Sequence, residues 1–401
     1  MVALAGRAER DLWILGTIRV ARSFSFGYVA FLLPLYLRHA GLTDAMIGLY
    51  ALLATLSSAL LTLASGYLGD LYSRKWTLMW VSLLPVGTYS IVLSGSRSVG
   101  LLMASSAFGL TLSPMGGGAG GGPVAPLQTA MVASRASGLR RTRIYSTLSS
   151  LSIVSALAGG AASSVVIRLM PRSYYHLLFL LALAIALGTT ALVPLISDEP
   201  DRALRQPRAG VLPRRSARNV GKVSLAGMMG SLGLGMVLPL LPVYFRDVGA
   251  SSLDVSLIYD ASYALAAVAV LFAHRAEEAL GRVRSVLVFR GLGTALLAPI
   301  PFIHSVPLAG AVYAMRTALY QMALPIRQSL TMDLYAPEER SRGLSISGVA
   351  RRLPYGVAAQ VGSILLQAGA YALLFSAAAA VGILDPVLYY VFFRGVEGER
   401  S

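Results

Sequence analysis

Long apolar runs separated by short polar breaks dominate the pattern of this 401-residue chain. About 20 apolar residues suffice for a helix to cross roughly 30 Å of hydrocarbon, and twelve runs of this kind fit the sequence. They cover residues 12–37, 45–69, 76–95, 99–131, 144–168 and 174–196, then 222–245, 253–273, 283–303, 306–332, 343–367 and 369–393. The pattern therefore predicts an all-α integral membrane protein with 12 transmembrane helices.

One long polar stretch, residues 197–221, interrupts this series after the sixth run. It contains three prolines and six arginines, and a segment of such low hydrophobicity and high charge cannot bury a core of its own. We therefore expect three parts, an N-terminal six-helix bundle over 1–196, a cytoplasmic linker over 197–221 and a C-terminal six-helix bundle over 222–401.

The two predicted bundles resemble each other in sequence. Four residues at the end of the first run, Pro34, Tyr36, Arg38 and Gly41, return 208 positions later as Pro242, Tyr244, Arg246 and Gly249. Further along, Arg141 and Arg143 return as Arg340 and Arg342 at the shorter offset of 199, and the difference falls on the glycine-rich residues 115–123. Because each half has an even number of crossings, both copies run in the same direction, as parallel repeats.

Composition supports a membrane protein and orients it. The chain is 56% hydrophobic and 13% charged, against roughly 25% charged in soluble domains. The net charge of +16 is unevenly distributed, since 22 of the 34 Lys and Arg fall on the amino-terminal side of the predicted membrane. This is the positive-inside bias. It predicts a multi-pass protein of the plasma membrane with both termini cytoplasmic, in contact with lipid and not with nucleic acid.

The sequence argues against an enzyme. There is no cysteine, which excludes disulfides and thiol catalysis, and no metal cluster or nucleophile triad stands out. The glycine run 116–122 lacks the Lys-Ser/Thr that follows in a phosphate-binding loop. We therefore expect no cofactor and no catalytic residue.

A short motif after the second run carries a family resemblance. Residues 66–75 read GYLGDLYSRK, which resembles the G-x-L-x-D-x-x-G-R-K signature of the major facilitator superfamily, although Ser73 stands where the family has glycine. The resemblance implies a transporter in which two six-helix bundles rock around a central cavity. It also implies a cytoplasmic gate at Asp70 and Arg74, with the degenerate second-half counterparts Glu278 and Arg282.

The charges inside the predicted membrane are mostly positive. Seven arginines fall within the runs, namely Arg19, Arg22, Arg290, Arg316, Arg327, Arg351 and Arg352. The carboxylates there are Asp260 and Asp385, with Asp333 at a cytoplasmic end. An intramembrane charge costs several kcal/mol and needs a partner or a function, so the excess of arginine favours an anionic substrate over a cation.

Some of these residues are candidate substrate ligands. The family resemblance implies that runs one, four, seven and ten line the cavity, and guanidinium forks bind carboxylate, phosphate or sulfate bidentately. The candidates are Arg19, Arg22, Gln128, Arg316, Arg327 and Gln328. The alternative is structural, because the glutamines could bond a neighbouring helix, and arginines in the cytoplasmic half, Arg327 included, could extend to lipid headgroups.

These observations predict a monomeric secondary active or facilitative transporter of a small organic or inorganic anion. An alternative is a proton-coupled efflux antiporter of drugs or metabolites, with protons as a partner and Asp260 as the coupling residue. Asp260 could equally be the fixed partner of an arginine. A third reading, from another class, is a membrane sensor without transport.

Overall fold

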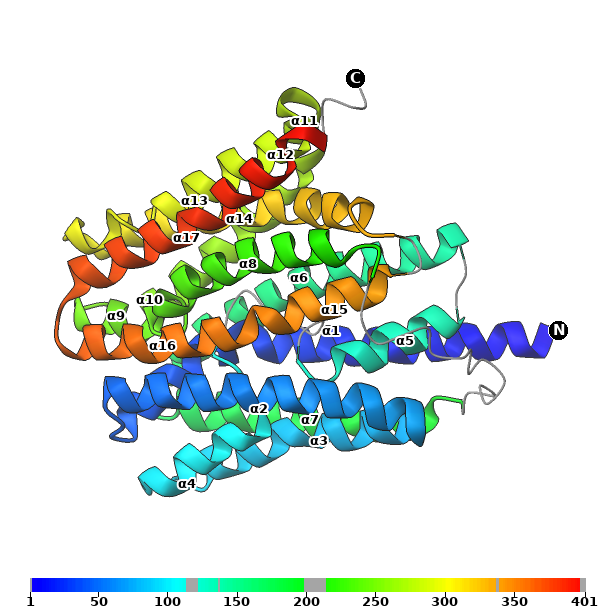
Figure 1. Cartoon of the computed structure of the whole chain (residues 1–401). Helices are drawn as coiled ribbons and strands as arrows, with labels where there is room; N and C mark the ends of the chain where they lie inside the picture. The colour runs from blue at the N-terminus through cyan, green and yellow to red at the C-terminus, as the bar shows by residue number, and fades with distance from the viewer. Residues whose placement is uncertain (1, 113–121, 136–137, 198–213, 337–338, 397–401) are drawn as a thin grey trace. The chain divides into compact units, whose positions relative to one another are not determined.

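The computed structural model describes residues 2–112, 122–135, 138–197, 214–336 and 339–396 (Figure 1). The chain divides into two compact units. The first comprises Met1–Thr43 and Leu53–Ala203, and the second comprises Asp44–Leu52 and Leu204–Ser401. The first turns of one helix thus belong to the second unit, and the division into 1–196, 197–221 and 222–401 stays a prediction.

The first unit contains most of seven α-helices and two short 3-10 turns. These elements are α1 (Val2–His39), α2 (Asp44–Leu71), α3 (Arg74–Leu93), α4 (Val99–Ala104), η1 (Ser105–Phe108), α5 (Ala125–Arg135), α6 (Gly138–Leu169), α7 (Tyr174–Leu192) and η2 (Val193–Leu195). Helix α1 packs mainly on α6 and α7, while α3 packs on α7.

The second unit repeats this plan with more interruptions. Its elements are α8 (Ala217–Val237), α9 (Leu241–Asp247), α10 (Ser252–Leu271), α11 (Ala273–Leu280), α12 (Arg282–Ser285), the π-helical turn η3 (Val286–Arg290), α13 (Gly291–Ala295), η4 (Ile300–Phe302), α14 (Val306–Asp333), α15 (Arg340–Ala350), α16 (Arg352–Gln367), α17 (Tyr371–Phe393) and η5 (Arg394–Val396). Helix α8 packs on α16 and α17, and α10 packs on α14.

Within the described residues, nine helical segments are long and apolar enough to cross a membrane. The predicted runs 99–131, 306–332 and 343–367 are not among them, so the count of twelve stays a prediction. The first of these is not one continuous helix, because η1 ends at Phe108 and Gly109 follows with a left-handed φ of 71°. The glycine-rich residues 115–121 lie outside the described part of the chain.

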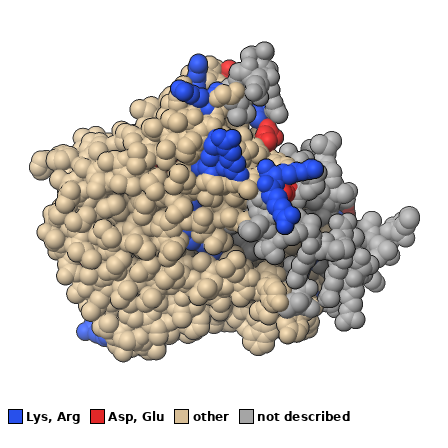
Figure 2. Space-filling model, in the orientation of Figure 1, with Lys and Arg blue, Asp and Glu red and all other residues tan. Residues whose placement is uncertain are grey.

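The outer surface of the helices is apolar. Leu60, Trp80 and Leu271 expose 68%, 66% and 79% of their surface, and uncharged side chains dominate the face shown in Figure 2. Soluble proteins rarely expose so many large apolar side chains. The surface therefore matches a lipid environment, in which helices satisfy their own backbone hydrogen bonds.

The sequence repeat recurs in the hydrogen bonds and the cores of the two units. The Tyr36 hydroxyl donates to the Val92 carbonyl oxygen over 2.9 Å, and 208 positions later the Tyr244 hydroxyl donates to the Ile300 carbonyl oxygen over 3.4 Å. The two hydrophobic cores match in the same way. In the first core Leu15, Ile18 and Leu78 stand where the second has Val223, Ala226 and Val286, at an offset of 208, and Leu127 and Met131 stand where it has Ile326 and Leu330, at 199.

The last helix of each unit shows a third offset, which the sequence pattern did not indicate. Phe179 packs edge-on against Tyr36, and Phe375 packs against Tyr244, so these two phenylalanines are equivalent at an offset of 196. Val193 and Tyr389 occupy the two cores at that same offset. Residues of α7 therefore correspond to residues of α17 that lie 196 positions later.

Candidate functional site

A buried ion-pair cluster lies inside the second unit. Asp385 on α17 is 1% exposed and binds two arginines from other elements. Arg290 at the end of η3 donates through Nε to Oδ2 over 3.1 Å. Arg327 on α14 approaches with Nη1 3.0 Å from Oδ2 and Nη2 2.9 Å from Oδ1, a two-pronged contact. Two cations on one carboxylate leave this cluster with a net positive charge.

An aromatic ring links the cluster to a third arginine. Arg290 also donates to the hydroxyl of Tyr320, and its Cζ lies 4.0 Å from the centroid of the Tyr320 ring. The Cζ of Arg316, one turn before Tyr320 on α14, lies 4.9 Å from the same centroid. Arg316 is fully buried. Cation–π contacts of this kind favour a guanidinium most when water is excluded.

The backbone of η3 positions Arg290. Residues Val286–Arg290 form a π-helical turn. Such turns are rare in proteins as a whole, but those that occur are often found at functional sites. The sequence pattern places Arg290 within a predicted run but does not pair it with Asp385. The available signal was the composition itself, because Asp385 is one of only two carboxylates well inside the predicted runs.

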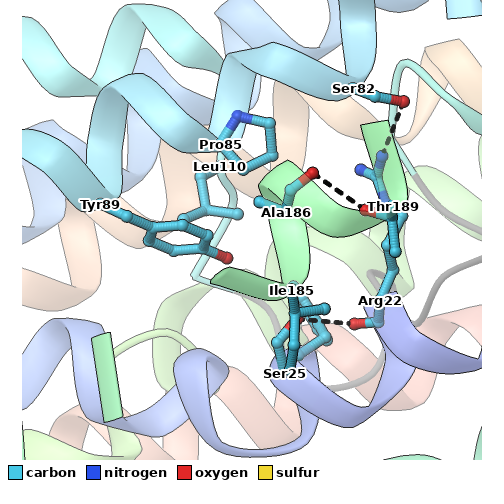
Figure 3. Close-up of a pocket in the computed structure, with 10 residues that line it drawn as sticks. Arg22, Ser25, Ser82, Pro85, Tyr89, Leu110, Ile185, Ala186 and Thr189 are labelled. Atoms are coloured by element: carbon cyan, nitrogen blue, oxygen red, sulfur yellow. Dashed lines mark hydrogen bonds between the residues drawn. The ribbon is translucent and has the colours of Figure 1, made fainter. Parts of the chain in front are cut away.

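The first unit contains a pocket at Arg22 (Figure 3). Its volume is about 50 Å³, which exceeds what one water needs, and its polar lining is Arg22, Ser25, Ser82, Tyr89 and Thr189. Phe26, Pro85, Leu110, Ile185 and Ala186 complete the wall. None of these described lining residues is acidic. The guanidinium of Arg22 donates through Nη1 to Ser82 Oγ over 3.3 Å.

The structure separates several of the other predicted ligands. Arg19 donates to Ser152 on α6 over 3.1 Å, whereas Arg22 turns to α3, so the two arginines do not share one site. Gln128 is 3% exposed, and neither of its amide atoms has a hydrogen-bond partner among the described residues. Gln328 is exposed at the end of α14, and Asp260 is half-buried on α10.

The predicted gate residues are only partly described. The side chain of Asp70 lies outside the described part of the chain, and Arg74 is half-buried at the start of α3. Arg282 binds Glu277 over 2.8 Å and Asp333 over 2.6 Å. Glu278 instead faces His274 at 3.2 Å. The acidic partners of Arg282 are therefore Glu277 and Asp333, which the motif comparison with Glu278 did not identify.

A second buried carboxylate network lies in the first unit and was missed from sequence. Arg135 donates to Asp11 Oδ2 over 2.9 Å and to the Ser197 carbonyl oxygen over 3.0 Å. Asp11 also accepts from the backbone N–H of Ser197 at 3.1 Å. Three distant segments, α1, α5 and the residues after η2, are thus joined by one carboxylate.

Glu339 plays a comparable part in the second unit. Its carboxylate accepts from the backbone N–H groups of Arg214, Arg215 and Ser216, at 2.9, 3.1 and 2.7 Å. Partial burial would raise the pKa of Glu339, but these donors outweigh it and hold the pKa below its usual value. The contact fixes the segment that leads into α8.

Comparison with known proteins identifies the architecture. A model of the Major Facilitator Superfamily matches residues 15–222 and 223–401. Crystal structures with the same fold include the nucleoside transporter NupG (9% identity, TM-score 0.76, covering 96% of this chain and all of that one) and a peptide transporter of the POT family (12%, 0.72, 96% and 97%). A D-xylose–proton symporter is similar (15%, 0.70, 95% and 96%). No curated protein sequence matches the chain significantly.

Proposed function

The chain belongs to the major facilitator superfamily, and we propose that it moves a small organic or inorganic anion by alternating access. The family match confirms the prediction made from residues 66–75 and places the chain among secondary transporters, not enzymes. Orientation with cytoplasmic termini in the plasma membrane and function as a monomer are parts of the same proposal.

The main support for an anionic substrate is the excess of buried arginine over buried carboxylate in the second unit. Arg290, Arg316 and Arg327 are 4%, 0% and 5% exposed, while Asp385 is the buried carboxylate beside them. Because Arg290 and Arg327 both bind Asp385, the cluster keeps unneutralised positive charge in a region where a bare charge is costly. A visiting anion lowers that cost, whereas a cation raises it.

Within this proposal the residues have different roles. Arg316, stacked on Tyr320, is the substrate ligand of the second unit, supported by Arg327 and Gln328 on the same helix. In the first unit the proposed ligands are Arg19, Arg22 and Gln128, of which Arg19 faces α6 and Arg22 faces α3. Four residues form the cytoplasmic gate, namely Asp70, Arg74, Glu278 and Arg282.

Flux in proteoliposomes tests the proposal. Uptake of labelled anions and cations is compared for the unaltered protein, for Arg316→Ala and for the control Arg352→Ala, which removes a half-buried arginine at the start of α16. We expect anion uptake that Arg316→Ala abolishes and Arg352→Ala leaves. Uptake that survives in both variants, or uptake of cations alone, overturns the anion proposal.

Proton coupling is tested in the same vesicles. A pH-sensitive dye inside them should respond when substrate is added if Asp260 couples transport to protons, and Asp260→Asn should remove the response while substrate still binds. An unchanged dye signal with the unaltered protein would show exchange or uniport.

A further inference from the structure

We propose that the Arg22 pocket of the first unit binds a small carboxylate, which takes the place that the Asp385 side chain occupies in the second unit. The proposal rests on the proposed anion transport and specifies one of its sites. Its evidence is a comparison of the two repeats, residue by residue, at the offsets that their cores establish.

The repeat relates the pocket to the ion-pair cluster. Ser82 on α3 corresponds to Arg290 at an offset of 208, as Leu78 does to Val286 in the cores one turn earlier. Thr189 on α7 corresponds to Asp385 at 196, the offset shown by Phe179 and Phe375. The wall of the pocket therefore coincides with the ion-pair site.

Arg22 has its own counterpart, which is Gly230 on α8. A Cβ atom placed on Gly230 would lie 2.8 Å from Asp385 Oδ2, so this position of the repeat directly abuts the carboxylate. In the first unit the same position holds an arginine, and the position of the carboxylate holds Thr189. The first unit thus has an arginine where the second has Gly230, and it lacks the acid.

Gln128 completes the correspondence. At the offset of 199 it matches Arg327, whose Nη1 donates to Asp385 Oδ2 and whose Nη2 lies within ion-pair distance of Oδ1. Gln128 is buried, and its amide atoms have no hydrogen-bond partner among the described residues. Buried polar atoms in native structures are almost always satisfied. Gln128 is not among the residues that line the Arg22 pocket, so it marks only the position that Arg327 occupies in the second unit.

The chemistry of the pocket selects a carboxylate end group. Arg22 offers a planar fork that matches two carboxylate oxygens, and Ser82 and Tyr89 add hydroxyl groups to the pocket lining. The hydroxyls of Ser25 and Thr189 donate to the carbonyl oxygens of Arg22 and Ala186. The volume of about 50 Å³ accommodates a carboxylate and a short apolar stem beside Pro85 and Leu110. Figure 3 shows the Arg22 guanidinium directed to Ser82 from α1.

Acetate, the smallest analogue of the Asp385 side chain, is the probe. Thermal unfolding of the full chain is followed in neutral detergent without anionic lipid, with acetate, chloride or ethylammonium at equal ionic strength. Because a ligand that binds the folded state raises its stability by mass action, acetate should raise the apparent Tm to a plateau. Ethylammonium should not. An equal rise in chloride, or none in acetate, overturns the proposal.

Two variants and a control locate the effect. Arg22→Gln should weaken the apparent affinity for acetate by about 10- to 100-fold, the value of a lost charge-assisted pair. Thr189→Asp supplies the missing acid from the chain itself and should abolish the acetate response without lowering stability. The control is Arg168→Gln, an exposed residue of the same unit. An acetate response that persists unchanged in both pocket variants overturns the proposal. If Arg22→Gln does not fold, the acetate response of Thr189→Asp tests the proposal by itself.

The flux assay separates this proposal from the proposed function. An acetate response that requires Arg22, in a protein that transports no anion, supports the pocket and overturns anion transport. Anion flux without any Arg22-dependent acetate response supports transport and overturns the pocket.

Discussion

Arg290 and Asp385 form an ion pair in the interior of the second unit, with Nε of Arg290 3.1 Å from Oδ2 of Asp385. The two residues are 95 positions apart and come from helical segments that the hydrophobic pattern assigns to different membrane spans. Both side chains are almost fully buried. The pair therefore neutralises part of a positive region that otherwise contains Arg316 and Arg327.

Removing the carboxylate should be costly. Asp385→Leu leaves Arg290 and Arg327 buried without an acidic partner, and breaking a buried pair costs about 3–5 kcal/mol. The free energy of unfolding in mixed micelles measures the loss. The triple variant that adds Arg290→Met and Arg327→Met should recover much of it, because no charge then remains buried. A loss below about 1 kcal/mol in Asp385→Leu would show that water or lipid phosphate already solvates these arginines.

The Asp11–Arg135 and Glu277–Arg282 ion pairs should differ in strength. Asp11→Asn disrupts a network whose side chains are 3% and 7% exposed, and we expect a loss of about 2–4 kcal/mol. Glu277→Gln weakens a pair that is 27% and 33% exposed, which is worth less than about 1 kcal/mol. Unfolding at low and high salt distinguishes them, because salt screens the exposed pair far more. Equal effects would contradict the burial difference.

Close approach of helices should make Gly27 irreplaceable. A Cβ atom at Gly27 on α1 would lie 2.0 Å from the Ala156 carbonyl oxygen on α6, so Gly27→Ala must push the helices apart at a cost of about 1–3 kcal/mol. The matched control is Gly188→Ala on α7, where a Cβ meets no atom within 4 Å. That change should be neutral or stabilise by up to about 1 kcal/mol. The prediction fails if both variants unfold at the same temperature.

Glu339 should make stability depend on pH in the acid range. Its pKa is lowered in the folded protein, so its contribution is complete above the unfolded pKa of about 4.3 and is lost as the pH falls through the folded value. The difference in Tm between the unaltered protein and Glu339→Gln should therefore be constant at neutral pH and shrink at acid pH. Arg215→Ala should not change this dependence, because the backbone of Arg215 donates, not its side chain. A difference that grows toward low pH would refute the assignment.

Much of the fold could be predicted from the sequence because its signals are one-dimensional. Apolar runs of membrane length indicate helices, and the offsets of 208 and 199 indicate the repeat that the cores reproduce. The fourth predicted span was wrong as a continuous helix, since η1 and Gly109 end it. Apolar composition alone does not predict a 3-10 turn that is followed by a residue with a left-handed backbone conformation.

The candidate sites were harder to predict from the sequence than the fold. The sequence identified Arg22, Gln128 and Arg327 as candidate ligands. For Asp385 it offered only the scarcity of carboxylates inside the runs, which does not say which arginine binds it, and nothing paired Arg135 with Asp11. Such pairs depend on the rotation of each helix about its axis, which the π-helical turn at Val286–Arg290 alters locally. They also depend on contacts between residues that lie 95 and 124 positions apart.

The sequence by itself determined a membrane protein of helical repeats, its family and an excess of arginine over carboxylate inside the membrane. Only the tertiary structure decided which arginines are neutralised, because an ion pair requires atoms within about 4 Å. It also decided that Thr189 occupies the position of Asp385, since the offset of 196 rests on ring contacts and core positions. The first unit therefore has Arg22 where the second unit has Gly230, beside a pocket in which the repeat provides a threonine instead of an acid.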